Sequence, residues 1–213
     1  GADIIMLDNM DIETTKKAIK IINKKAIIEC SGNIDITNIN RQIHAMSNNI
    51  GKYKVDEMKK RIELINPDIK VNTFKKKLDK NNIENFNLKY YDYVIDAIDT
   101  ITSKIYLIKY CYENNINIIS AMGAGNKLDP TRFKVVDIYE TSCCPLARVM
   151  RRELKKLGIK KLKCVCSDEI SSGEIIESDK IRKSSPSSIS FIPSTMGLII
   201  TSEVVKDLIL WNK

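Results

Sequence analysis

The chain has 213 residues, of which 43% are hydrophobic, so it is long and apolar enough for one domain with a buried core and is not wholly disordered. Its formal net charge of +8 suits a polyanionic partner such as RNA or a nucleotide, although a genome-level bias toward Lys, Ile and Asn explains such a charge nearly as well. Nothing resembles a signal peptide and no apolar run reaches about 18 residues, so we expect a cytoplasmic protein without a membrane anchor.

The first 34 residues predict one strand–helix–strand unit. The apolar run 2–7 is typical of a short buried strand, and Asp11 is placed as the N-cap of a helix over 11–23. A second strand is predicted over 25–29, followed by a turn at Ser31-Gly32-Asn33.

Strands and helices continue to alternate after residue 35. A polar loop through Arg41 leads to a helix that Asn66-Pro67 ends. The predicted elements are a helix over 55–65, a strand over 69–74, a short helix over 83–87, a strand over 93–97, a helix over 101–114 and a strand over 116–120. This alternation predicts an α/β fold with a doubly wound, Rossmann-like parallel sheet, in which ligands bind beyond the carboxyl ends of the strands.

The last third of the chain adds a strand over 133–138, a basic helix over 145–157 and a closing helix over 194–210. The Ser-rich, hydrophilic segment 168–193 predicts a mobile loop near the substrate. The closing helix is interrupted by Glu203, Lys206 and Asp207, which favours packing on the sheet over a membrane anchor.

Four residues stand out as ligands for nucleotide phosphates and a metal ion. Arg41-Gln42 lies in NINRQ and Lys54 in GKYKVDEM, where cationic side chains would hold phosphates. Asp99 follows the apolar strand in YVIDAIDT and is a candidate Mg²⁺ ligand, the alternative being a strand-end cap. No Gly-rich phosphate-binding turn precedes Arg41, because the only glycines before it are Gly1 and Gly32.

The cysteines and the single histidine do not form a metal-binding pattern. No Cys-x-x-Cys pair occurs, so a four-ligand zinc site is poorly supported, and we expect Cys143-Cys144 and Cys164-x-Cys166 to be ordinary thiols. We expect His44 to be a packed loop residue rather than a base.

From about residue 35 onward the chain resembles the tRNA threonylcarbamoyladenosine dehydratases, within the superfamily of ubiquitin-activating-like, ThiF-type adenylating enzymes. The segments that carry the resemblance are DITNINRQIHA (35–45), GKYKVDEM (51–58), INPDIKV (65–71), YVIDAIDTITSK (93–104), MGAGNKLDPTRFKVVDI (122–138), PLARVMRREL (145–154) and IPSTMGLIITSEVVKDLI (192–209). The combination of GAG-x-x-LDPT with PLAR separates the dehydratases from the sulfur-carrier activators, which usually carry zinc-binding cysteine pairs.

The resemblance implies a role for each matching residue. Arg41 and Lys54 would bind the phosphates of ATP, and Asp99 would hold Mg²⁺, so these three would carry the catalysis. Gln42, with Asn38 or Asn40, would orient the phosphates.

The implied reaction is the ATP-dependent cyclisation of the threonylcarbamoyl adenosine next to the anticodon of a tRNA. ATP turns a poor carboxylate electrophile into an acyl-adenylate, which the neighbouring carbamoyl group attacks intramolecularly. Such a ring closure needs no protein nucleophile, only charge neutralisation on the phosphates and positioning of the RNA. Arg148, Arg151 and Arg152 on the basic helix are candidate tRNA contacts, and the resemblance also suggests a homodimer.

Residues 1–34 resemble a different family. ADIIMLDNM and the E-x-SGNI ending are similar to a late strand–helix–strand segment of quinolinate phosphoribosyltransferase, an α/β barrel enzyme. A barrel fragment cannot close or form a complete site, so that activity is not expected. We therefore predict a junction near Ile34-Asp35, where a foreign segment replaces the Gly-rich first unit of a ThiF-type domain that covers 35–213.

Three other interpretations stay open. The chain is alternatively a catalytically inactive module that keeps a tRNA-binding or dimerising surface, and ATP-dependent stabilisation discriminates this from an active enzyme. Another ThiF-type enzyme, such as a sulfur-carrier activator, is the second alternative. A quinolinate phosphoribosyltransferase fragment is the most remote.

Overall fold

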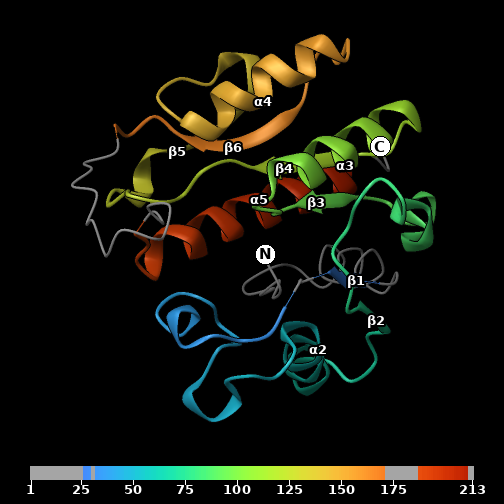
Figure 1. The fold of residues 1–213 in the computed structure, drawn as a ribbon, viewed down its shortest axis with the longest axis vertical. Coiled ribbons are helices and arrows are strands. Elements are labelled where there is room, and N and C mark those ends of the chain that lie inside the picture. Colours follow the sequence, from blue (N-terminus) through green and yellow to red (C-terminus); the bar gives the residue numbers. More distant parts are fainter. Residues whose placement is uncertain (1–25, 30–31, 171–186, 211–213) are drawn as a thin grey trace.

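The computed structural model describes residues 26–29, 32–170 and 187–210, which form an α/β fold (Figure 1). The strands are β1 (Ala26–Glu29), β2 (Val71–Phe74), β3 (Val94–Asp96), β4 (Ile118–Ala121), β5 (Phe133–Asp137) and β6 (Lys163–Ser167). The α-helices are α2 (Lys54–Ile65), α3 (Ile101–Glu113), α4 (Pro145–Lys156) and α5 (Phe191–Leu210). The short 3-10 helices are η1 (Ile36–Asn38), η2 (Ser47–Asn49), η3 (Ile83–Phe86), η4 (Leu88–Tyr90), η5 (Pro130–Arg132) and η6 (Ile138–Glu140). The predicted strand 2–7 and helix 11–23 lie outside the described residues.

The described strands form two sheets. β1 and β2 pair in parallel, with Ala26 opposite Val71. The second sheet has the order β3-β4-β6-β5, in which β3, β4 and β6 are parallel and β5 is antiparallel to β6. Within the described residues, β1 and β3 are each paired along one edge only, so the two sheets are not joined by strand pairing.

The predicted α/β class is confirmed, but the sheet is mixed rather than wholly parallel. β5 runs antiparallel because the connection 122–132 contains only a 3-10 helix and is too short for a crossover between parallel strands. β6 was not predicted, although it lies between β4 and β5. The short apolar run Cys164-Val165-Cys166, between Lys163 and Ser167-Asp168, was the available signal for this strand.

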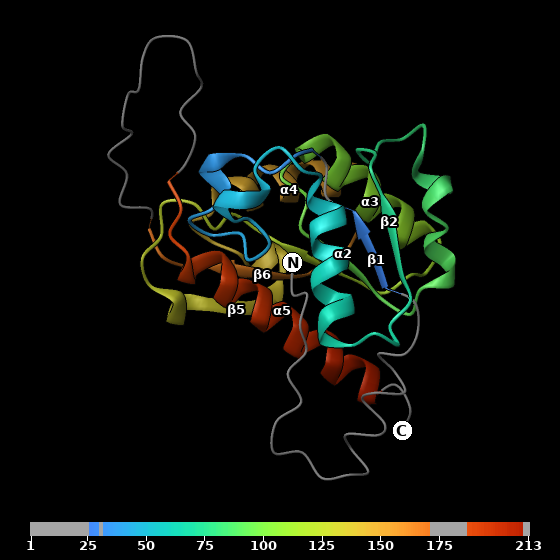
Figure 2. The ribbon, with the colours of Figure 1, turned by 90° about the horizontal axis from the view of Figure 1, so that it is seen from below.

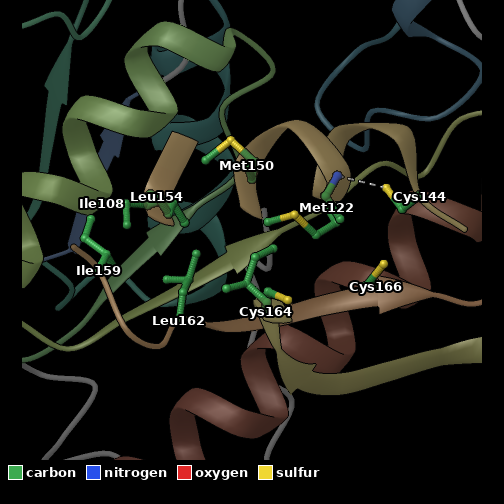
Figure 3. Packing of buried hydrophobic residues seen from close by; sticks show 11 residues of the cluster. Ile108, Met122, Cys144, Met150, Leu154, Ile159, Leu162, Cys164 and Cys166 are labelled. Carbon is green, nitrogen blue, oxygen red and sulfur yellow. Dashed lines mark hydrogen bonds between the residues drawn. The ribbon is translucent and has the colours of Figure 1, made fainter. Parts of the chain in front are cut away.

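Strands β4, β5 and β6 of the four-stranded sheet are covered on both faces, and their alternate side chains enter different cores, whereas Ile95 of β3 is 37% exposed. On β6, Cys164 and Cys166 join the core beneath α3 and α4, which Figure 3 shows, whereas Val165 joins the core beneath α5. Ile119 of β4 also lies on the α5 side. Figures 1 and 2 show the same arrangement, with α3 and α4 over one face and α5 across the other.

Helix α4 owes its position to an amphipathic sequence with clear start and stop signals. Pro145 occupies the first turn, and Ala147, Met150 and Leu154 bury one face at helical spacing. At the other end Gly158 adopts a φ of +71°, and the N–H groups of Gly158 and Ile159 bond back to the carbonyls of Lys155 and Leu154. This left-handed cap ends the helix and returns the chain toward β6.

Helix α5 packs on the sheet, as predicted, but it begins at Phe191 rather than at residue 194. Pro193 is tolerated in its first turn because N–H groups there have no partner within the helix. Asp207 accepts bonds from Tyr93 Oη (2.7 Å) and Lys163 Nζ, which places the polar side of α5 over β3 and β6. No helix in the described part of the chain is long and apolar enough to cross a bilayer.

Two leucines of α4 provide a matched test of this packing. Leu154 is fully buried, whereas Leu157, at the helix C-cap, is 42% exposed. We expect Leu154→Ala to lower the free energy of unfolding by about 2–5 kcal/mol, and Leu157→Ala by less than about 1 kcal/mol. Urea unfolding of both variants measures the difference, and equal losses would contradict the orientation of α4.

Candidate nucleotide-binding site

The loop that carries the predicted phosphate ligands is closed at its base just beyond β1. Asn33 forms an antiparallel bridge with Tyr53, and Ile34 N–H donates to the Lys52 carbonyl at 2.8 Å. Lys54 N–H donates to the Gly32 carbonyl at 3.3 Å. The start of α2, with Lys54 as its first residue, therefore lies beside the segment that follows the carboxyl end of β1.

Within this loop Asn38 holds the backbone. Asp35 caps η1 by accepting from Thr37 N–H at 2.8 Å, and Asn38 Oδ1 accepts from Asp35 N–H at 3.0 Å. Asn38 is buried, and its oxygen is committed to this capping box. The structure thus gives Asn38 a supporting role in the shape of the loop.

Arg41 and Lys54 are both half-buried cations, and neither forms an ion pair with another described residue. Arg41 Nη1 donates to the Thr37 carbonyl at 2.6 Å and to Asn40 Oδ1 at 3.0 Å, which leaves the rest of the guanidinium without a described partner. Gln42 Oε1 is buried without a hydrogen-bond partner among the described residues. Uncompensated positive charge of this kind suits an anionic ligand such as a phosphate group.

His44 is packed beneath this loop, as predicted, with 8% of its surface exposed. Burial and the nearby charges of Lys54 and Arg61 lower the pKa of its imidazole to about 4. The ring is therefore neutral near pH 7, and its buried nitrogens have no hydrogen-bond partner among the described residues.

Asp99 lies in the loop between β3 and α3, and its side chain is exposed. Arg41, Gln42 and Lys54 follow β1, whereas Asp99 follows β3. Within the described residues, no hydrogen bond or ion pair joins Asp99 to these three side chains. The described residues contain no cluster of three or more metal-ligating side chains. A single carboxylate is nevertheless the donor set that Mg²⁺ uses when nucleotide phosphates and water supply its other ligands.

A second loop, after β4, carries Gly123 and Gly125 of the GAG-x-x-LDPT motif. A Cβ on Gly123 would lie 3.3 Å from Cys144 Sγ, so glycine there permits a close approach to the start of α4. Asn126 adopts a left-handed φ of +55° and exchanges two bonds with Ser187: Asn126 N–H donates to the Ser187 carbonyl at 2.8 Å, and Ser187 N–H donates to Asn126 Oδ1 at 2.7 Å. Asn40 Nδ2 reaches the next residue, Ser188, at 2.9 Å.

Both flanks of the predicted mobile loop 168–193 are fixed to this second loop. Glu169 accepts from Leu128 N–H at 2.8 Å and from Asp129 N–H at 3.1 Å through its carboxylate, and its carbonyl accepts from Lys127 Nζ at 2.8 Å. Residues 171–186 of that prediction lie outside the described part of the chain. The segment 187–188 therefore links the loop after β4 to the loop that carries Arg41.

The thiols near this loop differ in their environment. Cys144 is the N-cap of α4, where its sulfur accepts from Ala147 N–H at 3.5 Å (Figure 3). Hydrogen bonds from the Cys166 thiol and from backbone N–H groups lower the pKa of the Cys144 thiol below its usual range, and the same contact raises the pKa of Cys166. Burial raises the pKa of Cys164 to about 12. The sequence did not predict the contact between Cys144 and Cys166, because it joins the start of α4 to β6.

The three arginines of α4 differ in their contacts. Arg148 and Arg152 are exposed, although Arg152 pairs with Glu153 at 2.8 Å. Arg151 is half-buried and donates to the Thr141 carbonyl at 2.7 Å, so it braces the turn before α4. Sequence reasoning missed the exposed lysines that continue this basic surface beyond the arginines, Lys155, Lys156, Lys160 and Lys161.

Half-buried cations after β1 and an exposed carboxylate after β3 are the features of an α/β domain that suit a nucleotide with its metal ion. The chain belongs to the ThiF family, whose model matches residues 31–212. The C-terminal domain of quinolinate phosphoribosyl transferase also matches residues 1–54, so the two matches overlap over 31–54.

Within the ThiF family, the chain is similar to two tRNA threonylcarbamoyladenosine dehydratases and to a solved structure of one of them. The chain is 46% identical over 189 residues to the tRNA threonylcarbamoyladenosine dehydratase of Bacillus subtilis, covering 83% of this chain and 74% of that protein. It is 41% identical over 120 residues to the Escherichia coli dehydratase, which is 56% of this chain and 45% of that protein. The crystal structure of E. coli TcdA in complex with ATP superposes with a TM-score of 0.81 at 28% identity, covering 92% of this chain and 82% of that chain.

The environment of His44 predicts a specific acid sensitivity. Its pKa is 6.5 in the unfolded chain and about 4 in the folded one, so between these values the unfolded state binds a proton that the folded state does not. The contribution of His44 to the free energy of unfolding is therefore complete above pH 6.5. It is lost as the pH drops to about 4, which lowers the free energy of unfolding by about 3 kcal/mol. Denaturant unfolding of wild type and His44→Leu isolates this contribution, and parallel pH curves for the two proteins would contradict it.

Proposed function

We propose that this chain catalyses the ATP-dependent dehydration of N6-threonylcarbamoyladenosine in tRNA to its cyclic form. The observation that carries the proposal is the 46% identity to a dehydratase across most of the chain, within a fold that superposes on an ATP-bound relative. The uncompensated cations of the loop after β1 supply a physical reason for ATP binding.

Each predicted ligand has a part in this proposal. Arg41 and Lys54 bind the phosphates of ATP, and Asp99 would hold the Mg²⁺ ion that neutralises charge on those phosphates. Asn40 and Gln42 orient the phosphates, and Asn38 keeps the loop in shape through its bond to Asp35.

The substrate carboxylate has no good leaving group, so ATP must first convert it into a reactive acyl-adenylate. The substrate carboxylate attacks the α-phosphorus of ATP and expels pyrophosphate, which gives an acyl-adenylate. The neighbouring carbamoyl group then attacks the acyl carbon, loses a proton and expels AMP, so that the ring closes. Positioning and charge neutralisation supply the rate enhancement, and no step requires a protein nucleophile.

The basic surface of α4 is the proposed tRNA contact. Arg148 and Arg152 project from it, whereas Arg151 acts mainly within the protein by bonding to Thr141. We also propose that the protein acts as a homodimer in the cytoplasm, as expected for a dehydratase of tRNA.

Residues 1–34, which precede the loop that carries Arg41, affect the affinity for ATP in this proposal. These 213 residues contain no Gly-rich turn ahead of Arg41, and β1 and β3 are not paired with one another. We propose that residues 1–34 replace the Gly-rich first unit of the family. ATP binding then depends on the cationic loop and Asp99.

Binding of Mg-ATP to the folded state is the first test. At a concentration 100 times its dissociation constant, a ligand of the native state stabilises it by about 2.7 kcal/mol, which raises the melting temperature by roughly 5–10 °C for a chain of this size. We expect this shift for wild type and for the control Asp68→Ala, which removes an exposed carboxylate away from the site. Arg41→Ala and Asp99→Ala abolish it. No shift in wild type would favour the inactive tRNA-binding module.

Salt dependence of RNA binding tests the surface of α4. Arg148→Ala with Arg152→Ala should weaken tRNA binding and reduce the slope of log K against log salt by about 2, because each phosphate contact contributes roughly one unit. The matched control is Lys59→Ala with Lys60→Ala on α2, which removes the same charge elsewhere. If both double variants reduced the slope equally, net charge alone would explain the binding.

A further inference from the structure

A fully buried ion pair lies directly beneath the loop that carries Asp99. Lys104 of α3 and Asp96 at the end of β3 both have 0% exposed side chains, and Lys104 Nζ lies 2.8 Å from Asp96 Oδ2. Ser120 Oγ of β4 donates to the same carboxylate oxygen at 2.7 Å. Removing two charges from water is costly, so such a pair is weak evidence for a contribution to stability.

The same pair fixes the backbone immediately before Asp99. Asp96 Oδ1 accepts from Ile98 N–H at 3.1 Å, and Lys104 Nζ donates to the Ile98 carbonyl at 3.3 Å. Both polar backbone groups of Ile98 are therefore held by the buried pair.

The other side of Asp99 is fixed as well. Thr100 is the N-cap of α3, and its carbonyl accepts from Lys104 N–H at 3.0 Å. Asp99 consequently sits between two anchored residues, with its carboxylate exposed at the end of β3. One residue, Lys104, contacts the backbone on both sides of it.

We propose that Asp96 and Lys104 are positioning residues that hold Asp99 in the geometry needed to bind Mg-ATP. This inference rests on the proposed function. Mg²⁺ demands near-octahedral geometry and tolerates little displacement of a ligand, so a loop with fixed backbone groups suits it. A misplacement of about 1 Å at a reacting site can lower a rate by about 100-fold.

The test removes the pair without leaving an unpaired buried charge. The double variant Asp96→Asn with Lys104→Met is compared with wild type in the full-length chain. The matched control is Lys109→Met with Glu113→Gln, an exposed pair 3.6 Å apart on the same helix. Thermal shifts are measured with Mg-ATP and, separately, with AMP in the absence of metal. In a third measurement, AMP formation from ATP and tRNA that carries N6-threonylcarbamoyladenosine is followed as a function of Mg²⁺ concentration.

We expect the Asp96/Lys104 variant to unfold cooperatively and to keep the shift with metal-free AMP. The Mg²⁺ concentration for half-maximal activity should rise about 10-fold or more, and the shift with Mg-ATP should shrink. A loss of stability alone would reduce both shifts, so the selective loss with Mg-ATP identifies positioning. The control variant should match wild type in every measurement.

Coupling to Asp99 provides the second criterion. In an Asp99→Asn background, where the weaker amide ligand leaves a reduced Mg-ATP shift to measure, the Asp96→Asn and Lys104→Met substitutions should cause no further loss, since their effect passes through Asp99. An additional loss in that background, or unchanged Mg²⁺ dependence of the Asp96/Lys104 variant, would overturn the positioning role. A wild-type chain that neither binds nor consumes Mg-ATP would instead overturn the proposed function, so the two failures are distinguishable.

Discussion

Burial of β4, β5 and β6 on both faces of their sheet is the constraint from which the remaining features follow. Two helices cover one face and one covers the other, so β4, β5 and β6 send alternate side chains into two separate cores. β6 illustrates this, because the thiols of Cys164 and Cys166 face one core and Val165 faces the other. Polar chemistry is thereby confined to loops at the strand ends, where the side chains no longer have to be apolar.

The strand ends are not merely solvent-exposed loops. The loop after β3 rests on a buried ion pair, and the loop after β4 is tied through Asn126 to Ser187. The next residue, Ser188, bonds to Asn40 in the loop after β1. A chain of hydrogen bonds therefore connects two loops that come from different sheets. These bonds join the loop that carries Arg41 to the loop after β4, although strand pairing does not join the two sheets.

Helix α4 combines two roles on opposite faces. Ala147, Met150 and Leu154 anchor it in the core, and the outward face presents arginines and lysines. Its start also shapes the loop after β4, because Cys144 caps the helix and lies against Gly123. The orientation of the proposed RNA surface is thus set by the same packing that fixes the loop beside the nucleotide site.

Local periodicity and charged loops were enough to predict the order of most helices and strands and the α/β class, and to select Arg41, Lys54 and Asp99 as candidate ligands, because these signals lie in short stretches of sequence. They did not predict β6 or the antiparallel direction of β5, since strand pairing depends on residues far apart in the chain. The bracing contacts of Asn38 and Arg151, and the contact between Lys104 and Asp96, became visible in the folded chain alone. A polar side chain is available to a ligand if no other residue of the protein bonds to it. Its bonding partners are distant in the sequence and become neighbours only when the chain folds.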